Sequence, residues 1–170
     1  MKVIQKTGSG DNYMKITKSD IRIIAFDQST TATGWAVLKQ KTGEIIEYGV
    51  LRPKGETNDR IIETVKKSLW LVEEYQASFV FIEGVQYQRN AVVLQVLAKL
   101  AGTLEIMLIE KGYFVNVVKA SEWRRKVGVK GRKRADLKKS AIQLVKDIYD
   151  IEAGEDECEA ILFARAFCDI

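Results

Sequence analysis

Residues 21–38 read IRIIAFDQSTTATGWAVL, and this stretch decides the fold. Residues 21–27 form an apolar run of strand length that ends on Asp27, and residues 33–39 form a second run after a short polar turn. The short turn predicts that the two strands pair in antiparallel fashion. A carboxylate at the tip of a buried strand costs free energy unless it has a partner. Asp27 is therefore the first candidate functional residue.

The whole chain has the composition of one folded domain. It contains 170 residues, of which 46% are hydrophobic and 29% are charged, so a packed core is expected. Residues 1–20 are polar and predict a flexible tail, which places the folded domain at residues 21–170. Two cysteines match no disulfide framework and no zinc motif, and no apolar run reaches the about 18 residues of a membrane span. These features predict a cytoplasmic protein.

The chain has no histidine, which excludes every catalytic triad that uses an imidazole base. A general base must then be a carboxylate, a lysine, a tyrosine or a metal-bound water. The net charge of +4 favours an anionic partner.

Hydrophobic periodicity beyond residue 38 predicts alternating strands and helices. The expected strands are 44–51, 78–83 and 113–118. The expected helices are 58–76, 90–111, a short one from 122 that Ser121 caps, 135–149 and 155–168. Short links make the first three strands a meander, and a helical crossover makes the fourth strand parallel to the first. We predict an α/β fold with a mixed five-stranded sheet of order 3-2-1-4-5 and helices on both faces.

In that sheet the winding direction reverses between strands 21–27 and 78–83. Ligands bind at such a reversal, off the carboxyl ends of the strands. Asp27 and Glu83 end these two strands, so we expect both carboxylates at the same edge.

The last helix adds two further acidic residues. Asp156 and Glu159 extend its apolar stripe backwards by one turn, whereas Glu155 and Glu157 point elsewhere. The stripe consists of Ala160, Phe163, Ala164 and Phe167. We expect Asp156 and Glu159 to face the sheet edge and to meet the two strand-end carboxylates there.

Each carboxylate also has a simpler explanation. Asp27 could bond the hydroxyls and amides of its own turn, and acidic residues suit the N-terminus of any helix. Four close carboxylates, however, repel one another unless a cation lies between them. Mg²⁺ prefers such oxygen ligands, and two ions of this kind support phosphodiester hydrolysis.

Four segments, in this order and spacing, resemble the RuvC-type Holliday junction resolvases. They are IIAFDQSTTATGWAVL at 23–38, FVFIEGVQYQRN at 79–90, LQVLAKLAGT at 94–103 and EDECEAILFARAF at 155–167. The segment at 120–141, ASEWRRKVGVKGRKRADLKKSA, is most similar to members encoded by bacteriophages. The resemblance runs from about residue 21 to the C-terminus.

The resemblance implies a ribonuclease H-like fold and a homodimer that pairs through helix 90–111. It also implies an endonuclease that uses two Mg²⁺ or Mn²⁺ ions per active site to nick four-way DNA junctions, in the host cytoplasm for a phage protein. The implied catalytic and metal-binding residues are Asp27, Glu83, Asp156 and Glu159. The chain departs from many bacterial members at Glu159, where they have aspartate, and at Gln86, where they often carry an aromatic residue.

Basic residues are concentrated in one part of the chain. Residues 119–139 carry a net charge of +8, twice that of the whole chain. Such a run can be a solvated face, but next to the carboxylates it is typical of a surface that binds DNA phosphates. The expected DNA contacts are Tyr87, Arg89, Arg124, Arg125, Lys130, Arg132, Lys133 and Arg134.

Three alternatives to a nuclease of branched DNA remain at this point. One is a related RuvC-like housekeeping family, but its members are shorter and lack the basic segment. The sequence DQSTT at 27–31 also resembles the first phosphate loop of actin-like sugar kinases, but those proteins need two such domains. A DNA-junction binder without catalytic activity would have the same fold, but it would have no use for four acidic residues.

Overall fold

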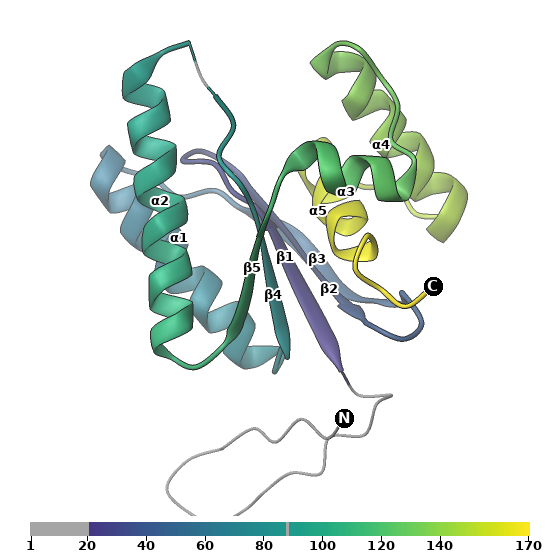
Figure 1. Ribbon diagram of the computed structural model, residues 1–170, viewed down its shortest axis with the longest axis horizontal. Helices are drawn as coiled ribbons and strands as arrows, with labels where there is room; N and C mark the ends of the chain where they lie inside the picture. Colours follow the sequence, from purple (N-terminus) through teal and green to yellow (C-terminus); the bar gives the residue numbers. More distant parts are fainter. Residues whose placement is uncertain (1–20, 88) are drawn as a thin grey trace, which may run out of the picture.

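The computed structural model describes residues 21–87 and 89–170 and contains one sheet between two layers of helices (Figure 1). The strands are β1 (Arg22–Asp27), β2 (Thr33–Lys39), β3 (Ile45–Leu51), β4 (Phe79–Glu83) and β5 (Phe114–Val118). The helices are α1 (Thr57–Glu74), α2 (Ala91–Glu110), α3 (Ala120–Val127), α4 (Arg134–Tyr149) and α5 (Glu155–Arg165). The predicted tail at residues 1–20 lies outside the described residues.

The strand order is β3-β2-β1-β4-β5, which confirms the predicted sheet. β1 pairs antiparallel with β2 and parallel with β4, and β4 pairs parallel with β5. The register places Asp27, the last residue of β1, opposite Gly34 of β2. The carboxyl ends of the three parallel strands therefore meet at one edge of the sheet.

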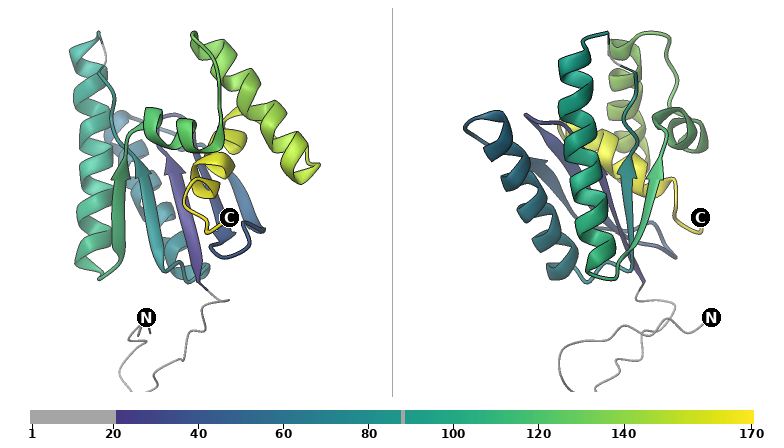
Figure 2. Two further views of the ribbon diagram at one scale, coloured as in Figure 1. Left: turned by 45° about the vertical axis from the view of Figure 1, so that its right-hand side comes forward. Right: turned by 60° about the vertical axis from the view of Figure 1, so that its left-hand side comes forward.

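Each face of the sheet carries its own apolar core, because successive side chains of a strand point to opposite faces. Ile24 and Phe26 of β1 pack on the face that α1 and α2 cover. Ile23 and Ala25 pack on the other face, under α5. Figure 2 shows α1 and α2 on one side of the sheet and α3, α4 and α5 on the other.

Helix α5 is buried on all sides. Every residue from Cys158 to Ala164 is buried, although the sequence predicted one apolar stripe. The reason is that Trp123 of α3 and Ala141 and Val145 of α4 join the same core from the outer side of α5. The helix thus lies between the sheet and a further helical layer.

Gly34 allows α5 to approach the sheet. A Cβ atom on Gly34 would lie 2.2 Å from the backbone oxygen of Asp156 and 3.4 Å from the Cβ of Ala160. The first distance is shorter than any real contact, so no other residue fits here without moving the helix. The first turn of α5 therefore lies directly on β2, beside Asp27.

Several details differ from the sequence predictions. Helix α3 begins at Ala120 after Lys119, so Ser121 is not its cap. Helix α2 begins at Ala91 with Asn90 as its cap, and its buried residues are Leu100, Leu104 and Leu108, whereas Val92 and Val93 are exposed.

The sequence analysis did not expect any stretch that could span a membrane. α2 is long and apolar enough to do so by length and composition alone. Core helices pass the same test, and one face of α2 packs into the core.

The approach at Gly34 makes a prediction about Gly34→Ala. The added methyl group collides with backbone atoms of Asp156, so we expect a loss of about 1–3 kcal/mol in the free energy of unfolding, typical of overpacking. Urea denaturation measures this loss. Gly84→Ala is the control, because the atom nearest to its added Cβ, Val117 Cγ1, lies at an ordinary contact distance of 3.4 Å. Equal stability of Gly34→Ala and the wild type would contradict the close approach.

Candidate active site

A cavity of about 650 Å³ opens at the carboxyl ends of β1 and β4. We call it the carboxylate pocket, because Asp27, Glu83, Asp156 and Glu159 all line it. The remaining lining includes the turn after β1, Val93 and Leu97 of α2, and the two guanidinium groups of Arg124 and Arg134. The structure therefore brings all four acidic residues of the sequence prediction around one space.

The pleat of the sheet directs the two strand-end carboxylates to the same side. Asp27 follows Ile23 and Ala25 at a spacing of two residues, and these two pack on the α5 face. Glu83 follows Phe79 and Phe81 in the same way on β4. Because β1 and β4 are parallel neighbours, both carboxylates reach the same edge of the α5 face.

The first two turns of α5 supply the other two carboxylates. Glu159 is buried, with 5% of its surface exposed, and the side chain of Asp156 is 29% exposed. Their two acidic neighbours do not line the pocket, although Lys138, the partner of Glu155, also lies 4.0 Å from Asp156 Oδ1. Glu155 forms an ion pair of 2.5 Å with Lys138, and Glu157 accepts a hydrogen bond of 2.6 Å from the backbone amide of Gly154.

Arg124 is the cation at the centre of the site. Its Nη2 donates to Glu159 Oε1 at 2.9 Å and lies 3.9 Å from Glu83 Oε2. Its neighbour Trp123 donates from Nε1 to the same Oε2 of Glu83 at 2.7 Å. Arg124 also stacks on Trp123, with the guanidinium carbon 5.0 Å from the ring centroid. The sequence analysis did not foresee either contact with Glu83, although a buried tryptophan N–H needs an acceptor.

Two of the carboxyl groups are harder to ionise than usual. Burial raises the pKa of Asp27 well above its ordinary value, and the charges of Glu83 and Glu159 raise it further. Burial also raises the pKa of Glu83, although the Trp123 hydrogen bond and Arg124 oppose this shift. Arg124, together with the charge of Arg134 near Glu83, therefore does not fully compensate the negative charge, and further positive charge would stabilise the site.

The turn after β1 is held by its own hydrogen bonds. Ser29 Oγ donates to the carbonyl of Ala32 at 2.8 Å, and Thr33 Oγ1 donates to the carbonyl of Ser29 at 2.9 Å. Within the described chain, no hydrogen bond joins Asp27 to this turn. The simpler explanation for Asp27, that it caps its own turn, therefore lacks support.

The four carboxylates are not arranged as a metal-binding cluster in the described residues. In residues 21–87 and 89–170, no three histidine, cysteine or acidic side chains are arranged so that they could hold a metal ion. The donors are nevertheless all carboxylate oxygens, which suit Mg²⁺ and Mn²⁺. The four residues fit such an ion chemically, and their role as ligands stays a prediction.

Of the residues predicted to contact DNA, two line this pocket, Arg124 and Arg134. Tyr87 and Arg89 lie exposed on the connection from β4 to α2, and Tyr87 is 85% exposed. Arg124 and Arg125 belong to α3, and Arg134 begins α4 and lines the pocket. Lys130, Arg132 and Lys133 lie on the connection between α3 and α4. Their contact with DNA stays a prediction.

Comparison with known proteins gives a consistent picture. A family model described as crossover junction endodeoxyribonuclease RuvC matches residues 23–166. RuvC from Thermus thermophilus in complex with Holliday junction substrate is similar at a TM-score of 0.70 and 12% identity, over 86% of this chain and 91% of that chain. The yeast mitochondrial Holliday junction resolvase is similar at a TM-score of 0.62 and 12% identity, over 87% and 78%.

A more distant similarity connects the chain with a viral enzyme. The Fowlpox virus resolvase, solved with substrate Holliday junction DNA, gives a TM-score of 0.50 at 11% identity, over 86% of this chain and 93% of that chain. No curated protein matches the sequence. At such low identities the structural similarities show a shared fold.

The raised pKa of Asp27 makes a prediction about stability. The folded protein holds this proton more tightly than the unfolded chain, so stability is lost as pH rises from about 3.8 through the pKa of folded Asp27. Asp27→Asn cannot ionise, and without metal ions it should be more stable than the wild type at neutral pH, by about 1.4 kcal/mol per unit of pKa shift.

Urea denaturation in a chelator, repeated across pH, measures this difference. The gap should close at acidic pH, and a gap that does not change with pH would contradict the explanation. Glu155→Gln is the control, because Lys138 lowers the pKa of Glu155, and this variant should gain no stability at neutral pH.

Proposed function

The chain belongs to the RuvC family and is a crossover junction endodeoxyribonuclease, and from this premise we propose that it cleaves Holliday junctions and other branched DNA with divalent metal ions. The observation that carries the proposal is the carboxylate pocket, where β1, β4 and α5 bring four acidic side chains together. The reaction would be the hydrolysis of a phosphodiester bond, and the protein would act in recombination, in the compartment that holds the DNA. An origin in a bacteriophage stays a prediction from the resemblance.

Asp27, Glu83, Asp156 and Glu159 would hold Mg²⁺ or Mn²⁺, with two ions per active site. When bound, such ions supply Lewis acid chemistry, which activates water and stabilises the leaving oxygen. The residues of the chain prepare this chemistry without a histidine. Rigid strands and α5 fix the carboxylates, while Trp123 orients Glu83 by donating to it.

Arg124 has a second role in this proposal. In the structure it neutralises Glu83 and Glu159, so it keeps mutually repelling carboxylates folded together. Arg124 also lines the carboxylate pocket, where its guanidinium group would be placed to bind a phosphate of the substrate strand in bidentate fashion.

Basic side chains around the pocket would hold the DNA backbone. Arg134 reaches the pocket itself, and Lys130, Arg132 and Lys133 continue from it along the surface. A binder without catalytic activity would gain from these residues but not from the four acids, which repel phosphate. The carboxylate pocket therefore favours the nuclease over the binder.

Substitution of the acids tests the proposal. Asp27→Asn should abolish cleavage of a synthetic four-way junction in Mg²⁺ and leave binding in Ca²⁺ largely intact, because the basic surface is unchanged. Glu159→Gln should also lose cleavage. Glu155→Gln is its matched control and should cleave almost normally, because Glu155 pairs with Lys138 outside the pocket. Cleavage rates on junction, fork, flap and linear duplex measure both effects, and undiminished cleavage by Asp27→Asn would refute the site.

We further propose that the protein is a homodimer that pairs through α2. One side of this helix exposes Gln95, Ala98, Ile106 and Ile109, and Gly102 on the same side has no neighbour within 4 Å of its Cβ position. Ile106 is 63% exposed and Ile109 is 50% exposed. Small residues within an apolar stripe allow two helices to pack closely, and a second copy of α2 supplies such a helix.

The proposed dimer interface predicts that substitution of two exposed isoleucines has different effects on the oligomeric state. Ile106→Glu places a charge in the proposed interface and should give a monomer in light scattering after gel filtration. Ile62→Glu changes an isoleucine of α1 that is 52% exposed and should remain dimeric. A wild-type monomer at micromolar concentration, or a dimer of Ile106→Glu, would contradict this interface.

A further inference from the structure

The ends of β1 and β4 part at the edge of the sheet where the carboxylates lie. β1 pairs with β2 as far as Asp27, and β4 pairs with β5 as far as Glu83. In the described part of the chain, the register between β1 and β4 ends one residue earlier, at the pair of Phe26 and Ile82. Regular strand pairing therefore does not join the two residues whose carboxylates line the pocket.

The side chain of Gln28 crosses this gap. Its Nε2 donates to the backbone carbonyl of Glu83, so a side-chain amide supplies a hydrogen bond between the strands beyond the last backbone pair. Because a carbonyl oxygen only accepts, this contact requires the N–H side of the amide. Gln28 directly follows Asp27 in the chain, so the bond fixes Asp27 and Glu83 relative to each other.

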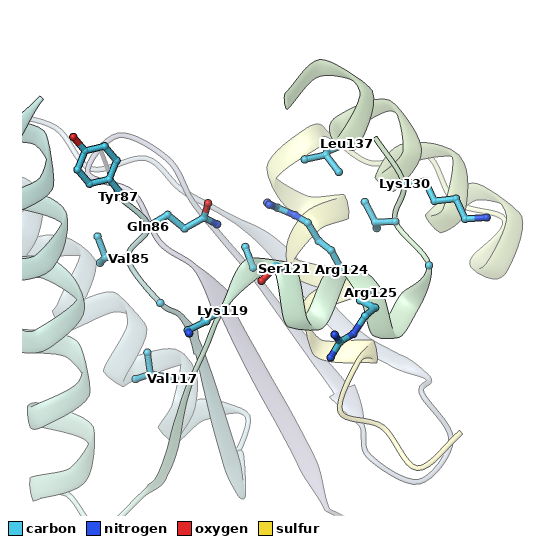
Figure 3. Close-up of a pocket in the computed structure, with 14 residues that line it drawn as sticks. Val85, Gln86, Tyr87, Val117, Lys119, Ser121, Arg124, Arg125, Lys130 and Leu137 are labelled. Carbon is cyan, nitrogen blue, oxygen red and sulfur yellow. The ribbon is translucent and has the colours of Figure 1, made fainter. Parts of the chain in front are cut away.

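The chain that leaves β4 borders two cavities. The second cavity, of about 960 Å³, lies next to the carboxylate pocket, and we call it the side pocket. Figure 3 shows Val85 and Gln86 on one side of it and Arg124 of α3 on the other. Gly84, Val85 and Gln86 line both cavities. Packing therefore holds this segment less firmly than a buried strand, and hydrogen bonds gain importance at the end of β4.

Electrostatic forces act to separate the ends of β1 and β4. The charge of Glu83 raises the pKa of Asp27, so the two carboxylates repel each other when both are ionised. The charged residues that line the side pocket are all basic and attract the Glu83 carboxylate toward that cavity. They are Lys119, Arg124, Arg125 and Lys130. The bond from Gln28 opposes this separation.

We propose that Gln28 is a positioning residue, which holds Glu83 at the distance from Asp27 that a divalent metal ion requires. This inference rests on the proposed nuclease function and adds how two of its four acidic residues are held together. Gln28 acts through the backbone of Glu83, whereas Trp123 acts on the carboxylate of the same residue. The two contacts together fix both the strand end and the orientation of its side chain.

The other half of the amide indicates that stability alone does not explain Gln28. Its Oε1 atom is buried and has no hydrogen-bond partner in the described part of the chain. An unpaired buried acceptor costs at least as much free energy as a typical hydrogen bond contributes, so the amide gives the fold little net stability. An apolar side chain of the same length would avoid this cost, which favours a functional reason for glutamine at this position.

Gln28→Met tests the proposal, because methionine keeps the length of the side chain but has no amide. Electron paramagnetic resonance detects free Mn²⁺, and a titration without DNA should show about 10–100-fold weaker binding than in the wild type, the range typical of removing a group that orients a metal ligand. Gln28→Leu removes the same amide with another shape and should behave alike. Gln143→Met is the matched control, since Gln143 donates to Asp147 on the exposed surface of α4, and it should bind Mn²⁺ normally.

A second measurement separates positioning from damage to the fold. The Mn²⁺ concentration that gives half-maximal cleavage of a four-way junction should rise by a similar factor in both Gln28 variants. A loss of folded protein would instead lower the rate at every Mn²⁺ concentration without moving this midpoint. Urea denaturation in a chelator should place both variants close to the wild type.

Unchanged Mn²⁺ binding, or an unchanged midpoint of cleavage, in both Gln28 variants would refute this role. A large loss of stability in both would also refute it, because it would indicate a structural role. In each of these cases wild-type cleavage of the junction leaves the nuclease function standing. Absence of wild-type cleavage on every branched substrate would refute the nuclease function and this inference together.

Discussion

The close approach of α5 to β2 at Gly34 is the constraint on which the site depends. The backbone oxygen of Asp156 occupies the space that a Cβ atom of Gly34 would need, and Gly34 is the register partner of Asp27. This contact places the first turn of α5 beside the end of β1, so Asp156 and Glu159 join the strand-end carboxylates. The acids are thus held by regular elements and not by loops, which is how a fold obtains accurate positions for functional groups.

The electrostatics of the site follow from this crowding. Burial and neighbouring carboxylates raise the pKa of Asp27 and Glu83, so the metal-free site contributes unfavourably to folding at neutral pH. Arg124 and Trp123 offset part of that cost by binding Glu83 and Glu159. A cluster of buried charges that destabilises the fold is typical of a functional site, because selection for stability alone would favour apolar residues at these positions. Arg124 also lines the side pocket, which places one guanidinium group between the acidic cavity and the basic one.

The sequence allowed much of this to be predicted. Strand-length apolar runs and short links gave the order of the sheet, because a two-residue period and a crossover rule leave few topologies. Period-two alternation also explains why Asp27 and Glu83 share a face. The helix pattern was less informative for α5, since α3 and α4 bury its outer side and remove the expected stripe. It was also less informative for α2, where the apolar side chains of Val92 and Val93 are exposed.

The sequence by itself determined the fold, the family and the four acidic positions, because these depend on local periodicity and on spacing along the chain. Only the tertiary structure decided what surrounds them. Contacts between residues far apart in sequence, such as Trp123 with Glu83 and Arg124 with Glu159, depend on how α3 packs against α5, and no local pattern records this. The side pocket has the same origin, since β5, α3 and the β4–α2 connection form it only after the sheet has brought them together.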